Sequence, residues 1–351
     1  MARCFAPQWR SAQRAFCTGT SERLSSYSSV DPVDIAHFAR LAEHWWDEDG
    51  EFKPLHRMNR VRVQFMREKL DEVYGWDAAM ADVLGKPIAA RAAPAEFLRG
   101  TRLLDIGSGG GILTESAARL GASVTGVDAT EANIRTALLH AEQDPSLHVR
   151  TDPHTSQAHS LAYVHGTAES LLASGKQYDI VTAMEVVEHV HEPAEFLRCI
   201  GSLLRPGGHL FLSTMSRTAL SYVLTIFLAE NVLRAVTPGT HRHAQYINPH
   251  EMVEFFKTMG WIRTGDPDAV PRARLSNGAP VAPVPPRLQF ETRGTMYLPV
   301  LDRWVLAPQR VADAQATAQN TPRWIPSALG GAQRITEQCN YFFWVRKPLD
   351  A

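Results

Sequence analysis

The chain has 351 residues, a length that accommodates one large α/β domain with insertions or two small domains. Its 36 Lys and Arg residues nearly balance 37 Asp and Glu residues, and the absence of basic blocks argues against nucleic acid as a partner. The four cysteines form no C-x-x-C pair, which is typical of unpaired thiols in a reducing compartment.

The first thirty residues differ from the rest of the chain. They contain four arginines, six serines and a single acidic residue, Glu22, and they lack the uninterrupted apolar run of a secretory signal. This composition predicts a mitochondrial transit peptide over 1–30, with a disordered tail as the alternative. Residues 31–351 would then form the mature domain.

A helical pattern begins at Asp31, where the side chain of Asp31 or of Asp34 can cap the helix N-terminus, and apolar residues recur at helical spacing up to Ala42. Two adjacent tryptophans, Trp45 and Trp46, follow. Such large aromatic side chains indicate either burial against an edge of a sheet or contact with a substrate. Both interpretations stay open at this point.

A second amphipathic helix is expected from Asn59 and carries Arg62 just upstream of a glycine-rich turn. A guanidinium in that place can pair with a carboxylate of a bound ligand. Residues 77–100 are rich in Ala and Pro and show little periodicity. We expect a surface connection there.

The glycine-rich turn is the strongest motif in the chain. A short apolar run precedes four glycines within 107–111, and a helix-forming stretch follows, which indicates a strand, a tight turn and a helix. A second apolar run at 124–127 ends in Asp128, so the unit should be a right-handed parallel crossover. Counted from Gly107, the last position of a G-x-G-x-x-G dinucleotide motif is Ile112. Because the Asp128 carboxylate can accept bonds from two ribose hydroxyls, the unit favours S-adenosylmethionine over NAD.

The remaining predicted elements complete a sheet. A helix is expected over 194–204, and the strands are expected at 161–165, 178–184 and 209–214. A strand at 261–264 and another at 340–345 should close the sheet as an antiparallel pair. Between these two we expect a long and poorly ordered insertion, because the sequence there is Pro-rich and then Ala/Gln-rich.

Residues 218–229 carry no charged side chain. They are too few for a transmembrane helix, which needs roughly 20 apolar residues. Apolar side chains surround most of the predicted helix and form no single stripe, so an interfacial helix is not indicated clearly. A buried helix over the site and a segment in contact with a membrane or a lipid tail are both consistent with the pattern.

A second group of chemically active residues follows the strand at 178–184. Glu185, Glu188 and His189 are spaced i, i+3 and i+4, which predicts one side of a helical turn. They lie at the carboxyl end of a strand, where open α/β sheets bind ligands. Two carboxylates and an imidazole can hold Mg²⁺, or they can act as a general base and its orienting partner. A helix N-terminus whose acids favour its dipole is the structural alternative.

Several stretches carry a resemblance to a known family. They are F-A-R-L-A-E-H-W-W-D-E-D-G-E-F-K-P-L-H-R-M-N at 38–59, D-I-G-S-G-G-G-I-L-T-E-S at 105–116, G-V-D-A at 126–129 and M-E-V-V-E-H-V at 184–190. Together with G-T-H at 239–241 and G-T-M-Y-L-P-V-L-D-R-W at 294–304, they resemble the ubiquinone-biosynthesis O-methyltransferases. The glycine turn is shared by many methyltransferases, whereas the tryptophan-containing stretch is specific. The resemblance spans 34–345 apart from insertions near 77–98, 144–160, 264–288 and 309–336.

The resemblance implies a fold and a site. The fold is the class I S-adenosylmethionine-dependent methyltransferase fold, a seven-stranded, mostly parallel, doubly wound α/β sheet with N-terminal helices and insertions. Carried over residue by residue, the resemblance implies that the donor contacts Arg62, Gly107, Asp128 and Met184. It implies in the same way that Mg²⁺ is held by Glu185, Glu188 and His189. The chain departs from the family at Ser108, where the family often has Cys.

The resemblance also implies an activity and a setting. The activity is methylation of ring hydroxyls of polyprenyl-dihydroxybenzoate and demethylubiquinol intermediates in ubiquinone biosynthesis. The setting is the matrix side of the mitochondrial inner membrane, as a peripheral protein in a complex with other ubiquinone-biosynthesis proteins. Another small-molecule methyltransferase and a non-catalytic donor-binding scaffold are the alternatives.

The expected chemistry gives His189 and Glu188 a catalytic role. Attack of a phenolate oxygen on the sulfonium methyl group neutralises two opposite charges, so a dry pocket favours the reaction. Mg²⁺ chelated by two neighbouring ring hydroxyls would lower their pKa, and His189 would take the proton if it is not a metal ligand. Both roles cannot belong fully to His189.

Overall fold

The computed structural model describes residues 28–83, 94–150, 159–226, 237, 242–263, 284–308 and 336–351. The predicted transit peptide at 1–30 therefore lies almost entirely outside the described residues, as do large parts of the predicted insertions.

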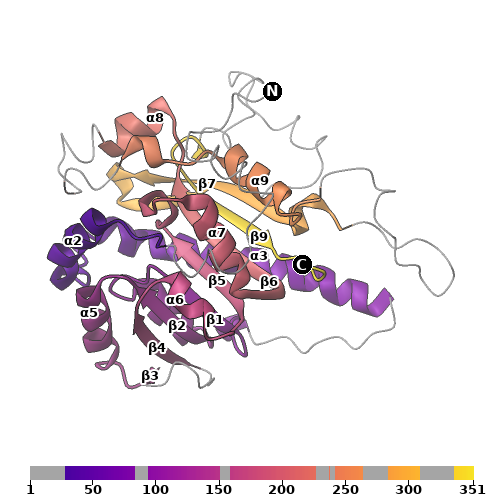
Figure 1. Ribbon diagram of the computed structural model, residues 1–351, viewed down its shortest axis with the longest axis horizontal. Coiled ribbons are helices and arrows are strands. Elements are labelled where there is room, and N and C mark those ends of the chain that lie inside the picture. Colours follow the sequence, from indigo (N-terminus) through magenta and orange to yellow (C-terminus); the bar gives the residue numbers. More distant parts are fainter. Residues whose placement is uncertain are drawn as a thin grey trace.

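A mixed sheet forms the centre of the molecule (Figure 1). Its described strands lie in the order β3-β4-β2-β1-β5-β6-β9-β7-β8, and those from β3 to β6 are parallel. The parallel strands are β1 (Arg102–Ile106), β2 (Ser123–Asp128), β3 (His148–Val149), β4 (Ser160–His165), β5 (Tyr178–Met184) and β6 (Leu204–Met215). The antiparallel strands are β7 (Phe290–Leu298), β8 (Arg303–Leu306) and β9 (Asn340–Arg346). The predicted fold class is confirmed, and the short edge strands β3 and β8 extend the sheet beyond the seven strands expected.

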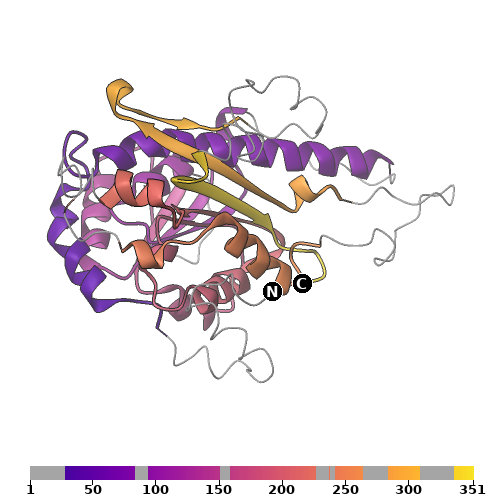
Figure 2. The ribbon, with the colours of Figure 1, turned by 90° about the horizontal axis from the view of Figure 1, so that it is seen from above.

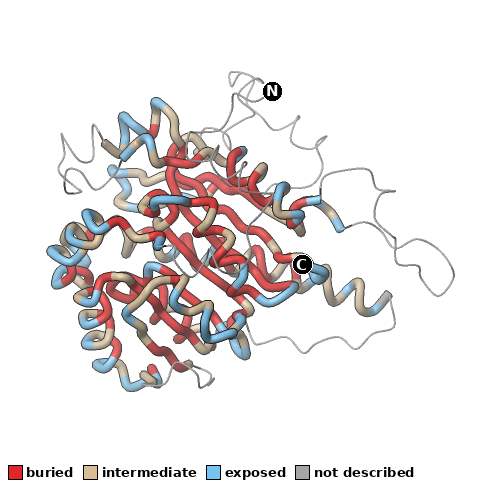
Figure 3. The backbone as a smooth tube through the Cα atoms, viewed as in Figure 1, coloured by how far each residue is buried: buried red, intermediate tan, exposed pale blue. Residues whose placement is uncertain are grey.

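Helices cover both faces of the sheet, as expected when neighbouring parallel strands are joined by crossover helices. One face packs against α6 (Ala168–Leu172), α7 (Pro193–Ser202) and α9 (Pro249–Thr258), and the other packs against α3 (Lys53–Val83) and α4 (Ile112–Arg119). Figure 2 shows α3 running along its face of the sheet, and Figure 3 shows that the central strands are buried. The remaining α-helices are α2 (Pro32–Leu41), α5 (Glu131–Ala141) and the short α8 (Ala219–Ser221).

The closing strand pair differs from the expectation. The partner of β9 is β7, with Phe290 opposite Val345, and not the segment at 261–264. Trp261 and Ile262 instead follow the turn after α9 and pack into the core, while residue 264 lies outside the described residues. The run at 261–264 predicts a strand because two consecutive large buried residues give the same sequence pattern in a strand and in a turn that packs into the core.

Helix α3 is longer at both ends than the sequence indicated. It begins at Lys53, with Pro54 in its first turn, where the missing amide proton costs no hydrogen bond. It continues to Val83, so the expected surface connection is helical over 77–83. This extension is rich in alanine, the best helix former, and the carboxylate of Asp77 accepts bonds of 2.9 and 2.6 Å from Arg346 of β9.

Within these described ranges, no helix combines the length and the apolar character needed to cross a bilayer.

Candidate active site

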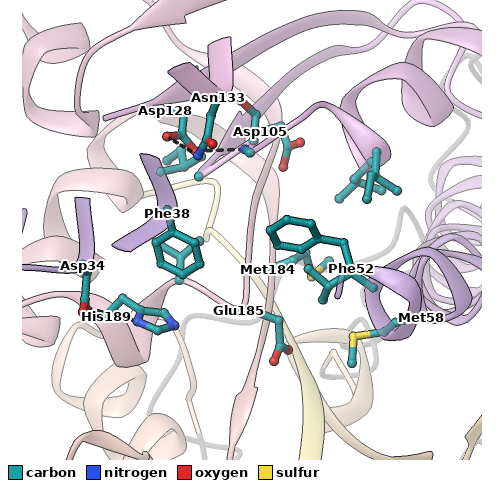
Figure 4. Close-up of a pocket in the computed structure, with 18 of the residues that line it drawn as sticks. Asp34, Phe38, Phe52, Met58, Asp105, Asp128, Asn133, Met184, Glu185 and His189 are labelled. Atoms are coloured by element: carbon teal, nitrogen blue, oxygen red, sulfur yellow. Dashed lines mark hydrogen bonds and ion pairs between the residues drawn. The ribbon is translucent and has the colours of Figure 1, made fainter. Parts of the chain in front are cut away.

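A cavity of about 800 Å³ opens at the carboxyl ends of β1, β2 and β5. This is the edge at which open α/β sheets bind ligands, and the volume is that of a small-molecule site. The wall includes residues of the glycine turn, of α2 and of the β7–β8 hairpin. Figure 4 shows side chains of α2 and of the ends of β1, β2 and β5 around it.

The glycine turn between β1 and α4 is fitted closely to its neighbours. Gly107 and Gly109 have positive φ angles of 69° and 54°, which L side chains rarely adopt. A Cβ atom on Gly107 would lie 2.5 Å from Val186, and one on Gly109 would lie 2.5 Å from the Trp45 ring. The backbone of the turn therefore lies where only glycine fits.

The tryptophan pair fixes this turn from outside the sheet. The indole Nε1 of Trp45 donates to Asn133 Oδ1 at 2.8 Å, and that of Trp46 donates to the carbonyl of Gly110 at 2.8 Å. Trp45 is 8% exposed and stacks on Phe52, with ring centroids 3.9 Å apart. Trp45 is therefore buried, but against the glycine turn and not against an edge of the sheet, and it also lines the cavity.

Asp128, at the end of β2, connects the turn to the next helix. Its Oδ2 accepts from the Gly109 amide at 2.9 Å, and its Oδ1 accepts from the Thr130 amide at 2.8 Å and from Asn133 at 3.2 Å. Burial raises the pKa of the carboxyl group, while these hydrogen bonds lower it in part. Asp128 also lines the cavity, which places a hydrogen-bond acceptor where a ligand hydroxyl can reach it.

Arg62 of α3 brings a buried positive charge to the cavity. Its Nε has no hydrogen-bond partner among the described residues, and burial lowers the pKa of the guanidinium, against the opposing effect of Glu185, Asp105 and Glu188. A buried donor without a partner is costly, which favours an anionic ligand at this position.

Asp105 is a cavity residue to which the sequence assigned no role of its own. It lies in β1 and is 3% exposed, and its two oxygens accept from the hydroxyls of Thr114 and Thr182, each at 2.7 Å. Burial raises the pKa of this carboxyl group. Asp105 thus joins β1 to α4 and β5 at the wall of the cavity.

The predicted helical face of Glu185, Glu188 and His189 is wrong. Met184 ends β5 and lines the cavity, and Glu185 then takes a left-handed conformation with φ of 58°. A short 3-10 helix begins only at Val187. The i, i+3, i+4 rule applies to a continuous α-helix, which the chain does not form here.

The three side chains consequently point to different surroundings. Glu185 lines the cavity, whereas Glu188 is 3% exposed and its Oε2 accepts from the Thr214 hydroxyl at 2.9 Å. His189 lines the cavity and lies with Nδ1 3.2 Å from Asp34 Oδ2 of α2. Figure 4 shows Glu185 and His189 in separate parts of the pocket.

These residues do not form a metal site as they stand. In the part of the chain that the structure describes, no group of three His, Cys, Asp or Glu side chains is placed to hold a metal ion. Mg²⁺ prefers near-ideal octahedral geometry with oxygen ligands, which the arrangement of Glu185, Glu188 and His189 does not supply.

Three parts of the site were not predicted from the sequence. Asn133 and Thr130 join the site through Asp128, and their only sequence signal is their place just after β2. Asp34 reaches His189 across a separation of 155 residues, which no local pattern reveals. The hairpin residues Met296, Tyr297 and Trp304 line the opposite end of the cavity.

Comparison with known proteins agrees with this geometry. A family model described as a methyltransferase domain matches residues 76–262. A Roseobacter denitrificans protein named ubiquinone biosynthesis O-methyltransferase is 40% identical over 233 residues, 66% of this chain and 83% of that protein. A Schizosaccharomyces pombe protein named ubiquinone biosynthesis O-methyltransferase, mitochondrial, is 35% identical over 335 residues, 94% of this chain and 91% of that protein. The solved plantazolicin methyltransferase BpumL, in complex with SAH and a desmethyl analogue, covers 90% of this chain and 97% of its own, with a TM-score of 0.41 and 12% identity, too distant to inform the site.

Proposed function

Because this chain belongs to the ubiquinone biosynthesis O-methyltransferase family, we propose that it methylates a ring hydroxyl of a polyprenylated aromatic intermediate of ubiquinone biosynthesis. The acceptors are polyprenyl-dihydroxybenzoate and demethylubiquinol, and the methyl donor is S-adenosylmethionine. The observation that carries the proposal is a cavity with a polar end at Asp128 and an apolar end at the β7–β8 hairpin. A polar donor and an apolar acceptor match these two ends.

The donor is assigned to residues of the polar end. The Asp128 carboxylate lines the cavity and can accept from a ribose hydroxyl, and the Arg62 Nε suits the carboxylate of the methionine part. Gly107 allows close approach of the backbone, and Met184 lines the wall between the two ends. S-adenosylmethionine supplies the electrophilic methyl group when it is bound.

The protein then has two tasks, alignment and removal of a proton. The ring oxygen attacks the methyl carbon, the carbon–sulfur bond breaks, and the hydroxyl proton goes to a base. We assign the base to His189, because the carboxylate of Asp34 engages its Nδ1 and can orient the ring. Glu188 is bonded to Thr214 and is not among the residues that line the cavity, which supports a positioning role for it.

Methyl transfer tests the function directly. The purified chain, given S-adenosylmethionine with a labelled methyl group and a polyprenyl-dihydroxybenzoate, should form the methylated ring and S-adenosylhomocysteine in equal amounts. Donor binding without transfer to any ring hydroxyl would contradict the proposal and favour a scaffold.

The Mg²⁺ that the resemblance implies is a separate prediction. Attack of the ring oxygen and removal of its proton by His189 are assigned without it. Transfer measured first in EDTA and then with added Mg²⁺ tests the requirement. Full activity in EDTA would contradict it.

The cellular setting is proposed at two levels. The Schizosaccharomyces pombe relative is named as mitochondrial, which supports a mitochondrial location for this chain. We further propose the matrix side of the inner membrane, with peripheral attachment and other ubiquinone-biosynthesis proteins as partners, because the acceptor is a membrane lipid. Fusion of residues 1–30 to a fluorescent protein tests the transit peptide, and a diffuse cytosolic signal would contradict it.

A further inference from the structure

Two segments that lie far apart in the sequence contribute apolar side chains to the wall of the cavity. One is the helical segment 219–226, which includes α8 and contributes Leu224 and Thr225 to the wall. The other is the β7–β8 hairpin, which contributes Met296, Leu298 and Trp304 among others. Figure 2 shows α8 and the hairpin at the same end of the molecule.

Exposed apolar side chains are concentrated on these two segments. Leu224 lines the cavity and is nevertheless 36% exposed. Nine large apolar side chains are exposed among the described residues, and five of them lie on these two segments: Tyr222, Val223, Leu224, Leu301 and Val305. Exposed apolar residues that gather in this way mark a binding surface, because leaving them in water is unfavourable.

The hairpin side of the cavity wall is held in place by α3. Trp304 Nε1 donates to the carbonyl of Pro54 at 2.8 Å, and Tyr297 donates to Asp302 at 2.6 Å. Asp302 lies 3.1 Å from the ammonium of Lys53. A wall fixed before binding does not need to be ordered by the ligand, which favours affinity.

We infer that the polyprenyl chain of the acceptor leaves the cavity between Leu224 and the β7–β8 hairpin, and that these two segments set a preference for long chains. The inference rests on the proposed function, because it takes the ring of the same acceptor to lie inside the cavity. A chain attached to that ring must extend away from the polar end at Asp128. These two segments both line the cavity and carry exposed apolar side chains, so they supply apolar contacts inside and outside it.

The test compares two acceptors with the same ring, one carrying a single isoprene unit and one carrying six, in nonionic detergent. Leu224→Asp should raise KM for the long acceptor about tenfold, which corresponds to lost contact with about two methylene groups. KM for the short acceptor should stay nearly unchanged. Leu301→Asp lies at an exposed position of the hairpin, where folding is not at risk. It should also raise KM for the long acceptor more than KM for the short one.

Leu139→Asp is the matched control. Leu139 lies on α5, is 59% exposed and is not among the residues that line the cavity, so its variant should change KM for neither acceptor. Equal effects of Leu224→Asp on both acceptors, or no preference of the unmodified protein for the long chain, would overturn the inference. The inference would also be overturned if Leu224→Asp no longer sediments with phosphatidylcholine vesicles while the ratio of KM values for the two acceptors is unchanged. That result would assign the segment 219–226 to contact with the membrane. Failure of the unmodified protein to methylate even the short acceptor would instead overturn the proposed function.

Discussion

Asp128 fixes the glycine turn, and the proposed donor site uses the same carboxylate. Two of its hydrogen bonds come from backbone amides, of the glycine turn and of the segment that starts α5. These bonds fix the direction of the carboxylate before any ligand arrives, so binding would not have to order it. The sequence predicted the place of Asp128 at the end of a strand, but not the internal bonds that orient it, and its ribose partner stays a prediction.

Substitution of Asp128 should weaken donor binding. Asp128→Ala is expected to lower the affinity for S-adenosylmethionine by about 1.5 to 3 kcal/mol, because a hydrogen bond to a charged group is lost. Titration calorimetry measures the change, and circular dichroism shows whether the variant is folded. Asp144→Ala, at a partly exposed aspartate that pairs with Arg119 and does not line the cavity, is the control. Unchanged affinity in a folded variant would remove Asp128 from the donor site.

His189 should show a different signature, in rate and not in donor affinity. His189→Ala is expected to reduce kcat by about 10² to 10⁴ at neutral pH, the usual effect of losing a general base. The loss should shrink at high pH, where the phenol ionises unaided. His250→Ala, at an exposed histidine on α9, should leave the rate unchanged. A deficit that is equal at every pH would contradict the assignment of the base.

The elements that the sequence predicted well are those whose signals are local. The glycine turn, its flanking strands and Asp128 lie within thirty residues, and each step of that unit limits the next. The pairing of β9 with β7 is not local, and it became visible only in the structure. The prediction for Glu185 was wrong for another reason. A single residue at positive φ interrupts a helix, although the spacing of the residues in the sequence stays the same.

Helix α3 and strand β7 are joined by a buried network of charges. Lys69 is fully buried, lies 2.6 Å from Glu72 and pairs with Glu291 of β7. Arg293 of the same strand is also buried and pairs with Glu68 of α3 and with Glu291. This network fixes the helix that carries Arg62 to strand β7, and both elements contribute residues to the wall of the cavity.

Removal of one member of this network should be costly. Lys69→Ala is expected to reduce the free energy of unfolding by about 3 kcal/mol, because it leaves the buried Glu291 carboxylate short of a partner. Denaturant unfolding measures the difference. Lys257→Ala, which removes a half-exposed pair with Glu254, should cost less than about 1 kcal/mol. Equal costs for the two variants would show that the buried network adds no stability.

At the scale of the whole molecule, the order of the strands explains why the site could be predicted only in part. The end of the cavity at Asp128, where we propose that the donor binds, lies at β1, β2 and β5, which are neighbours in the sheet and carry the recognisable motifs. The end proposed for the acceptor is lined by β7 and β8, which lie toward the opposite edge of the sheet, together with α2 and the segment that includes α8. Such an end has no compact sequence motif, because its residues come together only when the chain is folded.

The same sheet buries a histidine that makes the stability of the whole molecule depend on pH. His209 of β6 is 2% exposed and lies between the rings of Tyr74 and Trp344. Burial, followed by the charges of Arg346 and Arg205, lowers its pKa to about 3. In the unfolded chain the pKa is about 6.5, so below that pH the unfolded state binds a proton that the folded state does not. The contribution of His209 is therefore present above pH 6.5 and is lost as the pH falls.

The expected loss is about 1.4 kcal/mol per pH unit between about pH 6 and pH 4. The raised pKa values of Asp105 and Asp128 act in the opposite direction, because those folded carboxyls bind protons more readily than the unfolded ones. A comparison between the unmodified protein and His209→Phe cancels those contributions, since the variant keeps an aromatic ring in the same place and cannot titrate. The free energy of unfolding of each protein is measured with urea at pH 7, 6, 5 and 4. As the pH falls, the unmodified protein should lose stability relative to His209→Phe. If the free energies of unfolding of the two proteins instead change in parallel with pH, His209 is protonated in the folded state. The rings around His209 would then tolerate a buried positive charge, which contradicts the prediction.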